Sequence, residues 1–327
     1  MRVIGLAVTI ALSFTLAPFA AEAQPAGKIP RIGVLAAGTV AGLATRHEAL
    51  RQGLRELGYV EGQNIIIEAR HAEGRLERLP PLAAELVRLN VDLIITSGDH
   101  GIRAARSATQ TIPIVVALTG DLVRPGYVAS LARPGGNITG LTTFGPELSA
   151  KRLEFLKATF PKATRVVVVL NPDNTANVTA FKEMEATARA LGLQLREVNV
   201  RKSEDLAGAF QIALRGRPNA MIALGDAVLL TPPARIVDFA AKNRLPAMYA
   251  VQDFVDAGGL MYYGPNVADM YRRAATFVDR ILKGSNPAYL PIEQPTKFEL
   301  VINMKTAKAL GLTIPQSVLF RADQIIE

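Results

Sequence analysis

One short segment of the chain combines residue types that could perform acid–base chemistry. In "ITSGDHGIRAARSAT" (95–109), Asp99 precedes His100, and a histidine oriented by a carboxylate is the base in many hydrolases. Ser97 and Gly98 in the same loop could instead hold a ligand through a hydroxyl and backbone N–H groups. Adjacent loop residues usually point in different directions, and aspartate is common as a helix N-cap. The segment therefore favours ligand contact or helix capping over catalysis.

Other reactive groups are scarce. The chain has 3 histidines, His47, His71 and His100, and no pair of them has metal-ligand spacing on one helix or strand. Cysteine is absent, which excludes disulfides, thiol nucleophiles, iron–sulfur sites and a lipid anchor on an N-terminal cysteine. No glycine-rich dinucleotide motif, P-loop or G-x-S-x-G motif is present. The sequence therefore predicts no metal site, no cofactor and no catalytic residue.

Three acidic residues late in the chain follow apolar segments. Asp226 ends "NAMIALGD", a strand that should be buried, where an uncompensated charge is costly. A cationic group on a ligand could balance this charge, and so could hydrogen bonds within the protein. Asp253 and Asp256 could cap a helix at the surface, and Asp253 also falls close enough to a strand end to reach a cleft.

Apolar segments alternate with amphipathic ones along the chain. Segments such as "RIGVLAA" (31–37), "VDLIITS" (91–97) and "RVVVVLN" (165–171) predict strands buried on both faces, with helices between them. This pattern is typical of an α/β fold in which helices cover both faces of parallel sheets. The segment "GYVASLA" (126–132) is predicted to be a short helix.

The alternation restarts after about Phe144, which predicts two similar α/β lobes. We expect the chain to cross between the lobes more than once. The segments 140–146 and 263–266 are the expected crossings, because their glycine and proline residues permit a hinge.

In doubly wound sheets, ligands bind beyond the carboxyl ends of the strands. The predicted ligand-binding residues therefore lie at or just after strand ends, and they are rich in hydroxyls, glycines, carboxylates and amides. No lysine or arginine is among them, unlike in a phosphate site. They are Gly38, Thr39, Ser97, Gly98, Asp99, His100, Thr119, Gly120, Asp121, Thr143, Asn171, Asp173, Asp226, Tyr249, Asp253 and Tyr263.

The N-terminal segment has the pattern of a secretory signal peptide over residues 1–23. Arg2 supplies a positive start, residues 3–20 are almost entirely apolar, and Ala21-Glu22-Ala23 fits a cleavage site before Gln24. The apolar run could just span a bilayer as an anchor, but the cleavage pattern favours removal. An exported chain without cysteine fits the bacterial periplasm, and no later segment is long and apolar enough to span a membrane.

The charge balance argues against nucleic acid as a partner. The net charge is +8, but lysine and arginine are scattered over predicted helix faces. Aromatic residues make up 6% of the chain and tryptophan is absent, so no basic stripe with stacking residues is formed. We interpret the charge as solvated surface.

Long segments of the chain resemble one known family. "LRELGYVEGQNIIIEARHAEGRLERLPPLAAELVRLNVDLI", "SLARPGGNITGLTT", "ELSAKRLEFLK", "AAKNRLPAMY", "DAGGLMYYGPN" and the C-terminal "LPIEQPTKFELVINMKTAKALGLTIPQSVLFRADQIIE" are similar to the ABC-transporter substrate-binding proteins. This branch of the family includes tryptophan- and tyrosine-binding members.

The resemblance implies a type 1 periplasmic-binding-protein fold, in which two Rossmann-like lobes with parallel sheets are joined by a three-strand hinge. Lobe 1 would comprise 28–143 plus 266–292, and lobe 2 would comprise 144–265 plus 293–327. It further implies a monomer that closes on a small solute and delivers it to an ABC permease in the inner membrane, without catalysis.

For an amino acid ligand, the resemblance suggests roles for particular residues. The carboxylate would bind Ser97 and Gly98 at the start of a helix, with an additional contact from Thr119 or Gly120. The ammonium would bind Asp226, with Asp121 as the second choice. Tyr249 and Tyr263 would line a pocket for the side chain of the amino acid.

The chain departs from its relatives at Gly98-Asp99-His100, where small residues, often a Thr-Pro-Ala type of run, are usual. Asp99 and His100 would make the cleft narrower and more polar, which leaves room for a solute other than an aromatic amino acid. Two alternatives stay open: a sensory binding module that docks on a receptor, and an exported α/β enzyme that uses Asp99 and His100.

Overall fold

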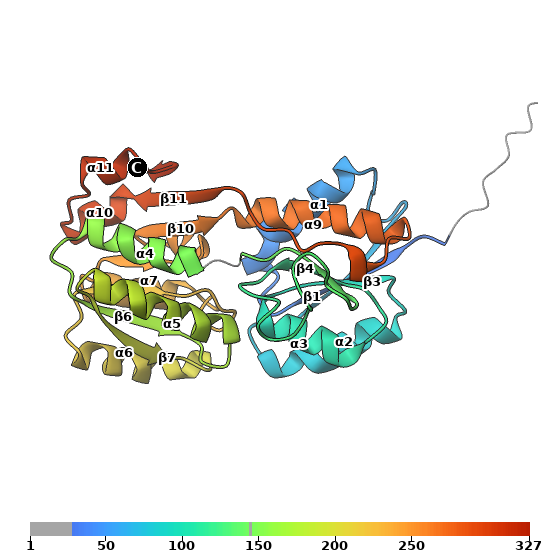
Figure 1. Cartoon of the computed structure of the whole chain (residues 1–327), viewed down its shortest axis with the longest axis horizontal. Helices are drawn as coiled ribbons and strands as arrows, with labels where there is room; N and C mark the ends of the chain where they lie inside the picture. Colours follow the sequence, from blue (N-terminus) through green and yellow to red (C-terminus); the bar gives the residue numbers. More distant parts are fainter. Residues whose placement is uncertain (1–27, 144–145) are drawn as a thin grey trace, which may run out of the picture.

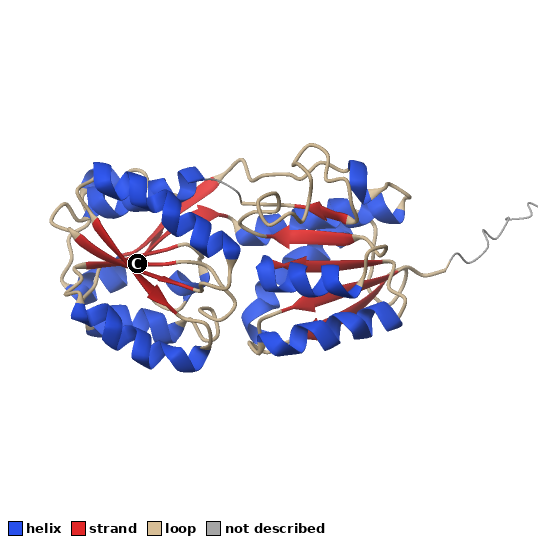
Figure 2. Cartoon of the chain, turned by 60° about the horizontal axis from the view of Figure 1, so that its bottom comes forward, coloured by secondary structure: helices blue, strands red, loops and turns tan. Residues whose placement is uncertain are grey.

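The computed structural model describes residues 28–143 and 146–327. The signal peptide predicted for residues 1–23 lies outside this part of the chain. Two α/β lobes lie side by side along the long axis of the molecule (Figure 1), and helices flank each sheet on both faces (Figure 2). No helix of the described residues has the length and apolar character needed to cross a bilayer.

The sheet of lobe 1 has five strands in the order β2-β1-β3-β4-β5, and each pair of neighbouring strands is parallel. The strands are β1 (Arg31–Ala36), β2 (Ile66–His71), β3 (Leu93–Ser97), β4 (Ile114–Leu118) and β5 (Ile138–Gly140). The helices are α1 (Ala44–Glu56), α2 (Leu79–Arg88), α3 (Gly98–Ala108) and α9 (Val267–Leu282), with short 3-10 turns at Ala41–Leu43, Leu76–Arg78 and Pro287–Tyr289. Helix α9 packs beside α1 although it is distant in sequence (Figure 1).

The strands of lobe 1 are apolar on both faces because each face packs against helices. Ile32 and Val34 of β1 belong to the core that includes residues of α1 and α9. Leu35 belongs to the opposite core, with α2 and α3 residues such as Leu86 and Ile102. The period of two along a strand thus sends alternate side chains to two separate buried layers.

The sheet of lobe 2 has seven strands in the order β12-β11-β10-β9-β8-β6-β7. The strands are β6 (Arg165–Leu170), β7 (Gln194–Asn199), β8 (Ala220–Ala223), β9 (Ala247–Tyr249), β10 (Met261–Pro265), β11 (Phe298–Asn303) and β12 (Gln324–Ile326). The helices are α4 (Pro146–Thr159), α5 (Thr175–Ala190), α6 (Leu206–Arg215), α7 (Ala234–Lys242), α8 (Asp253–Asp256), α10 (Met304–Leu310) and α11 (Gln316–Leu319), with a 3-10 turn at Ser203–Asp205.

One strand pair of lobe 2 departs from the predicted parallel arrangement. Strands β10 and β11 are antiparallel, with Tyr263 opposite Leu300. The reason is topological: β10 leaves lobe 2 toward α9, and β11 returns from lobe 1 along the same path in the opposite direction. The other neighbouring pairs among the described strands of this sheet are parallel.

The chain passes between the two sheets three times, after β5, after β10 and before β11. The first and third crossings are bonded to each other. Leu141 forms a parallel bridge with Glu293, whose backbone N–H donates to the carbonyl of Gly140 at 2.9 Å. The backbone N–H of Thr142 donates to the carbonyl of Glu293 at 3.0 Å. The residue numbers predicted for the domain boundaries stay a prediction, because the sheets define only the lobe to which each element belongs.

The helix predicted for 126–132 is wrong: this segment consists of turns and bends. The left-handed backbone of Gly126, with φ of +69°, begins it, and Gly135 just beyond it has φ of +80°. Before it, the carboxylate of Asp121 accepts the backbone N–H groups of Val123 and Arg124, which fixes a turn. An irregular loop therefore connects β4 to β5.

Candidate ligand-binding pocket

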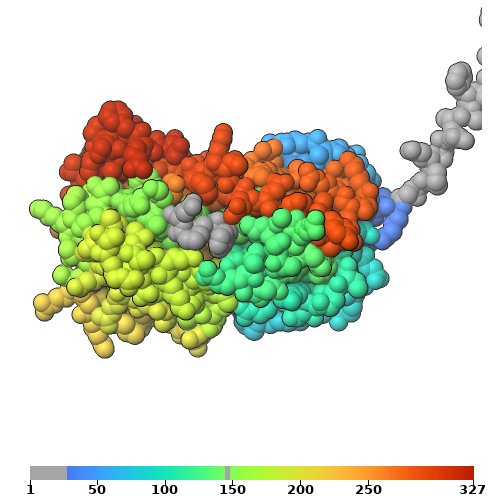
Figure 3. All heavy atoms as spheres, viewed as in Figure 1, coloured from blue at the N-terminus to red at the C-terminus, as the bar shows by residue number. Residues whose placement is uncertain are grey.

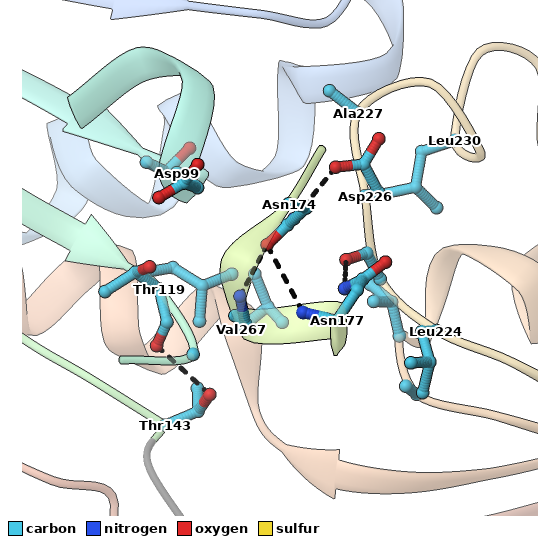
Figure 4. A pocket seen from close by; sticks show the side chains of 18 of the residues that line it. Asp99, Thr119, Thr143, Asn174, Asn177, Leu224, Asp226, Ala227, Leu230 and Val267 are labelled. Carbon is cyan, nitrogen blue, oxygen red and sulfur yellow. Dashed lines mark hydrogen bonds between the residues drawn. The ribbon is translucent and has the colours of Figure 1, made fainter. Parts of the chain in front are cut away.

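A cavity of about 240 Å³ lies between the two lobes. Lobe 1 lines it with the segments that follow β1, β3 and β4, and lobe 2 lines it with the segments that follow β8 and β9 and with residues of α4 and α5. Figure 4 shows Asp99 and Thr119 of lobe 1 across the cavity from Asn174 and Asp226 of lobe 2. The cavity thus lies at the carboxyl ends of both sheets, where open α/β sheets bind ligands.

Most of the residues predicted from strand ends line this cavity. They are Gly38, Thr39, Ser97, Gly98, Asp99, His100, Thr119, Gly120, Asp121, Thr143, Asp226 and Asp253. The structure brings them together from both lobes because strand ends within a parallel sheet share one edge.

Four predicted residues lie elsewhere. Asn171 is fully buried behind the cavity wall, and Asp173 lies at the surface in an ion pair with Arg201. Tyr249 and Tyr263 do not form the predicted side-chain pocket. Tyr249 is 1% exposed and belongs to the lobe 2 core, where it stacks on a phenylalanine ring, and the Tyr263 ring packs beside another one. Tyr249 thus lies inside one core of lobe 2, and the partly buried Tyr263 packs against the other core of the same lobe.

Asp226 follows β8, and its side chain has no exposed surface. Its Oδ1 accepts hydrogen bonds from Asn171 Nδ2 at 3.0 Å and from the backbone N–H of Val228 at 2.9 Å. Its Oδ2 accepts from Asn174 Nδ2 at 2.8 Å and lies 3.3 Å from His100 Nε2 of lobe 1. Burial raises the pKa of Asp226, but the bonds from His100, Asn174 and Asn171 outweigh burial and hold the pKa below its usual value.

The carboxylate of Asp226 is therefore balanced by the protein itself. Asn174, which points at it in Figure 4, is also the N-cap of α5 and accepts the backbone N–H groups of Ala176 and Asn177. The sequence reasoning left a choice between a cationic ligand group and internal hydrogen bonds, and internal bonds occupy both carboxylate oxygens.

Asp99 lies in the first turn of α3 and is 3% exposed. Its Oδ1 accepts from Tyr127 Oη at 2.6 Å and from Thr175 Oγ1 of lobe 2 at 3.3 Å, and its Oδ2 forms an ion pair with Arg103. Burial and the bond to Asp99 raise the pKa of Tyr127 to about 12. Asp99 is not the N-cap of α3, which is Ser97.

The two neighbours that suggested a catalytic pair have different partners. Asp99 bonds within lobe 1 and to Thr175, while His100 faces Asp226 and Asn171 of lobe 2. Asp99 therefore does not orient the imidazole of His100, and the adjacency in sequence does not produce a dyad.

Polar contacts join the lobes on several sides of the cavity. Arg46 of α1 pairs with Asp253 of α8 at 2.5 Å, and Arg124 lies 3.6 Å from Glu183 of α5. Arg103 donates to the backbone carbonyl of Asp173 at 3.3 Å. On the face shown in Figure 3, the yellow-green surface of lobe 2 meets the green surface of lobe 1. The structure is therefore one in which the lobes touch around the cavity.

Hydroxyl groups of lobe 1 at the cavity also have partners. Tyr271 Oη of α9 donates to Ser97 Oγ at 2.7 Å, which leaves the hydroxyl proton of Ser97 available to another acceptor. Thr143 Oγ1 donates to the carbonyl of Thr119 at 3.1 Å, the contact drawn in Figure 4.

The sequence reasoning missed pocket residues that lie on helices. The predicted set holds no arginine, but Arg46 and Arg152 both line the cavity. The sequence does contain a pattern that indicates Arg152. It lies about one helical turn from Leu148 and from Phe155 on the same face of α4, so a charged residue interrupts a stripe of buried apolar residues. Other cavity residues on α4 and α5 are Ser149, Asn177 and Glu183.

Two histidines meet away from the cavity. The rings of His47 on α1 and His71 on β2 are 5.1 Å apart, although no two histidines have ligand spacing on one element. Burial is the main reason why the pKa of His47 falls to about 4, and positive charge on His71, Arg51 and Arg46 adds to it. Within 28–143 and 146–327, no group of three histidine or acidic side chains could hold a metal ion.

Comparison with known proteins identifies the family. The model of the ABC transporter substrate binding proteins matches residues 31–326. The chain belongs to this family. A tyrosine-binding protein of Clostridioides difficile strain R20291 is 26% identical over 262 residues, which cover 80% of this chain and 75% of that protein.

Two solved structures superpose closely on most of this chain. One is the ABC domain of Streptococcus pneumonia in complex with L-Trp, with a TM-score of 0.85, 26% identity and coverage of 91% of this chain and 99% of that one. The other is a conserved domain protein of Vibrio cholerae, with a TM-score of 0.86, 28% identity and coverage of 91% and 100%. The predicted type 1 periplasmic-binding-protein fold is confirmed.

Proposed function

We propose that this substrate-binding protein is the periplasmic component of an ABC importer and that its two lobes close on a small solute, namely an amino acid or a related amine or carboxylate. The observation that carries the proposal is the ring of polar contacts between the lobes around the cavity, above all His100 of lobe 1 facing Asp226 and Asn171 of lobe 2. A solute held by both lobes would favour this closed arrangement over an open one.

The amino-acid class rests on two relatives. One is named a tyrosine-binding protein, and the structure of another contains L-Trp. Polar side chains from both lobes at the cavity support a zwitterion as the ligand, and the first ligand contacts to test are Ser97, Thr119 and Asp121. Export through a cleaved signal peptide, delivery to a permease, a monomeric state and the absence of turnover are parts of the same proposal.

A thermal-shift screen of residues 24–327 tests the function. The panel would contain the L-amino acids, short peptides, purines, sugars and dicarboxylates. A ligand at 100 times its Kd adds about 2.7 kcal/mol to the free energy of unfolding, which raises Tm visibly. Binding of one class, with no product detected by mass spectrometry after incubation, is expected. Consumption of the bound compound would contradict a pure binding role, and the absence of any response would remove the solute-binding proposal.

A further inference from the structure

Arg152 is a buried cation at the wall of the cavity. It lies on α4, one turn after Ser149, and is 7% exposed. Burial lowers its pKa to about 10, and Tyr262 and Tyr263 offset only part of that effect, so the guanidinium stays charged at neutral pH. A buried charge without a counter-charge is costly to the folded state.

The bonds that Arg152 makes leave part of its guanidinium free. Nε donates to the backbone carbonyl of Tyr263 at 2.8 Å, and Nη2 approaches the carbonyl of Ala250 at 3.5 Å. Tyr263 lies in the middle of β10, and Ala250 directly follows the neighbouring strand β9, so contacts to two adjacent strands orient the fork. Of the five N–H groups of an arginine, both on Nη1 and the second on Nη2 have no protein acceptor among the described residues.

The other charged groups at the cavity differ from Arg152 because the protein already balances them. Arg46 pairs with Asp253, and Asp99 pairs with Arg103. Among residues 28–143 and 148–327, no carboxylate forms an ion pair with Arg152, and its hydrogen-bond acceptors there are the backbone carbonyls of Tyr263 and Ala250. The wall formed by lobe 2 therefore carries one positive charge that nothing in the described protein neutralises.

We propose that the free end of the Arg152 guanidinium, formed by Nη1 and Nη2, binds the carboxylate of the solute, so that the pocket selects carboxylic acids. Planar fork-to-fork pairing is the geometry that arginine offers a carboxylate. The inference rests on the proposed solute-binding function and makes it more specific. It moves the carboxylate from the start of α3 in lobe 1, where Ser97 and Gly98 were expected to hold it, to α4 in lobe 2.

The first test compares acids with their amides on the wild-type protein. Isothermal titration would use L-tyrosine, L-tryptophan and L-leucine, each beside its primary amide, together with any further acid that raises Tm in the screen and its amide. The amide keeps the shape and the ammonium but lacks the negative charge. We expect the best acid to bind at least about 30-fold more tightly than its amide, as for one partner of a buried charge pair.

The second test asks whether Arg152 is the cause of that preference. In Arg152→Gln, the ratio of the affinity for the acid to the affinity for its amide is expected to fall to within about 3-fold of unity. Arg152→Lys is expected to keep part of the wild-type ratio, because lysine has the positive charge but not the planar fork. Arg189→Gln, an exposed arginine at the end of α5, is the matched control and should leave the ratio unchanged. A purely structural role would lower stability without changing the ratio.

The outcomes separate this inference from the proposed function. Equal affinity for acid and amide in the wild type, binding of an uncharged solute alone, or an unchanged ratio in a folded Arg152→Gln would overturn the role of Arg152 and leave solute binding intact. If Arg152→Gln does not fold, the wild-type comparison and Arg152→Lys decide. Binding of nothing in the panel would overturn both proposals.

Discussion

Replacement of Asp226 by alanine is expected to destabilise lobe 2. The carboxylate accepts hydrogen bonds from the side chains of Asn171 and Asn174 and from the backbone N–H of Val228, and its side chain is fully buried. Removing it leaves these buried donors without acceptors and takes away the carboxylate that lies 3.3 Å from His100 Nε2. Each orphaned donor costs about 1–3 kcal/mol, and a broken buried charge network typically costs about 3–5 kcal/mol, so we expect about 3–5 kcal/mol in total.

Urea denaturation followed by circular dichroism measures this effect. For a protein of this size m is about 3 kcal/mol/M or more, so the midpoint of unfolding should fall by roughly 1 M. Asp238→Ala makes the same chemical change at an exposed position of α7 and should stay within about 0.5 kcal/mol of the wild type.

If the free energy of unfolding of Asp226→Ala is less than about 1 kcal/mol below that of the wild type, the donors have found other acceptors and the structural role of Asp226 is refuted. The same variant separates the two roles considered for Asp226. The structural role predicts the loss of stability in the absence of solute. An ammonium-binding role predicts little loss of stability but weaker binding of amines than of their deaminated analogues.

Three further perturbations have defined outcomes. His100→Ala should weaken binding of the solute found by thermal shift about 5- to 30-fold in titration calorimetry, because the closed arrangement loses a contact between the lobes; an unchanged Kd would remove His100 from closure. Gly140→Ala should cost about 3 kcal/mol or more in urea unfolding, because φ is +130° there and a Cβ would lie 2.1 Å from the carbonyl oxygen of Val116; wild-type stability would refute the crowding. Because the folded-state pKa of His47 is about 4 against 6.5 in the unfolded chain, the unfolded chain binds a proton that the folded one does not as pH falls from 6.5 to 4. The free energy of unfolding should decrease as pH falls through this range, and it should decrease less in His47→Leu. Equal pH profiles for the variant and the wild type would contradict this.

The fold was predictable because its strands are apolar on both faces. Val166 and Val167 on β6 show why: they are adjacent in sequence, both are buried, and they belong to opposite cores of lobe 2. Only a sheet covered by helices on both sides buries such neighbours. The antiparallel pairing of β10 and β11 was not predictable from either strand, because it follows from the return path of the chain between lobes.

The candidate site was predictable where strand ends define it and not where helices do. Ser97 and Asp226 could be placed at the cavity because Ser97 ends the buried strand β3 and Asp226 lies shortly after the buried strand β8. Arg46 and Arg152 lie within helices, and the side of a helix that meets the other lobe depends on how the lobes are arranged. Tyr249 was misplaced because its position in the strand does not say which face of the sheet the ring takes, and burial in the core decided it.

The charge arrangement of the cavity explains why an acid is the solute class to test first. Asp121 accepts two backbone N–H groups, and Arg124 lies near Asp121 and Glu183 from the two lobes. A solute ammonium would have to share carboxylates that already have partners. A solute carboxylate would instead reach free donors on Arg152 and remove the cost of a buried, unbalanced cation. Because recognition of the acid relieves a cost that the folded protein already bears, whereas recognition of the amine competes with existing bonds, the carboxylate should contribute the larger share of affinity.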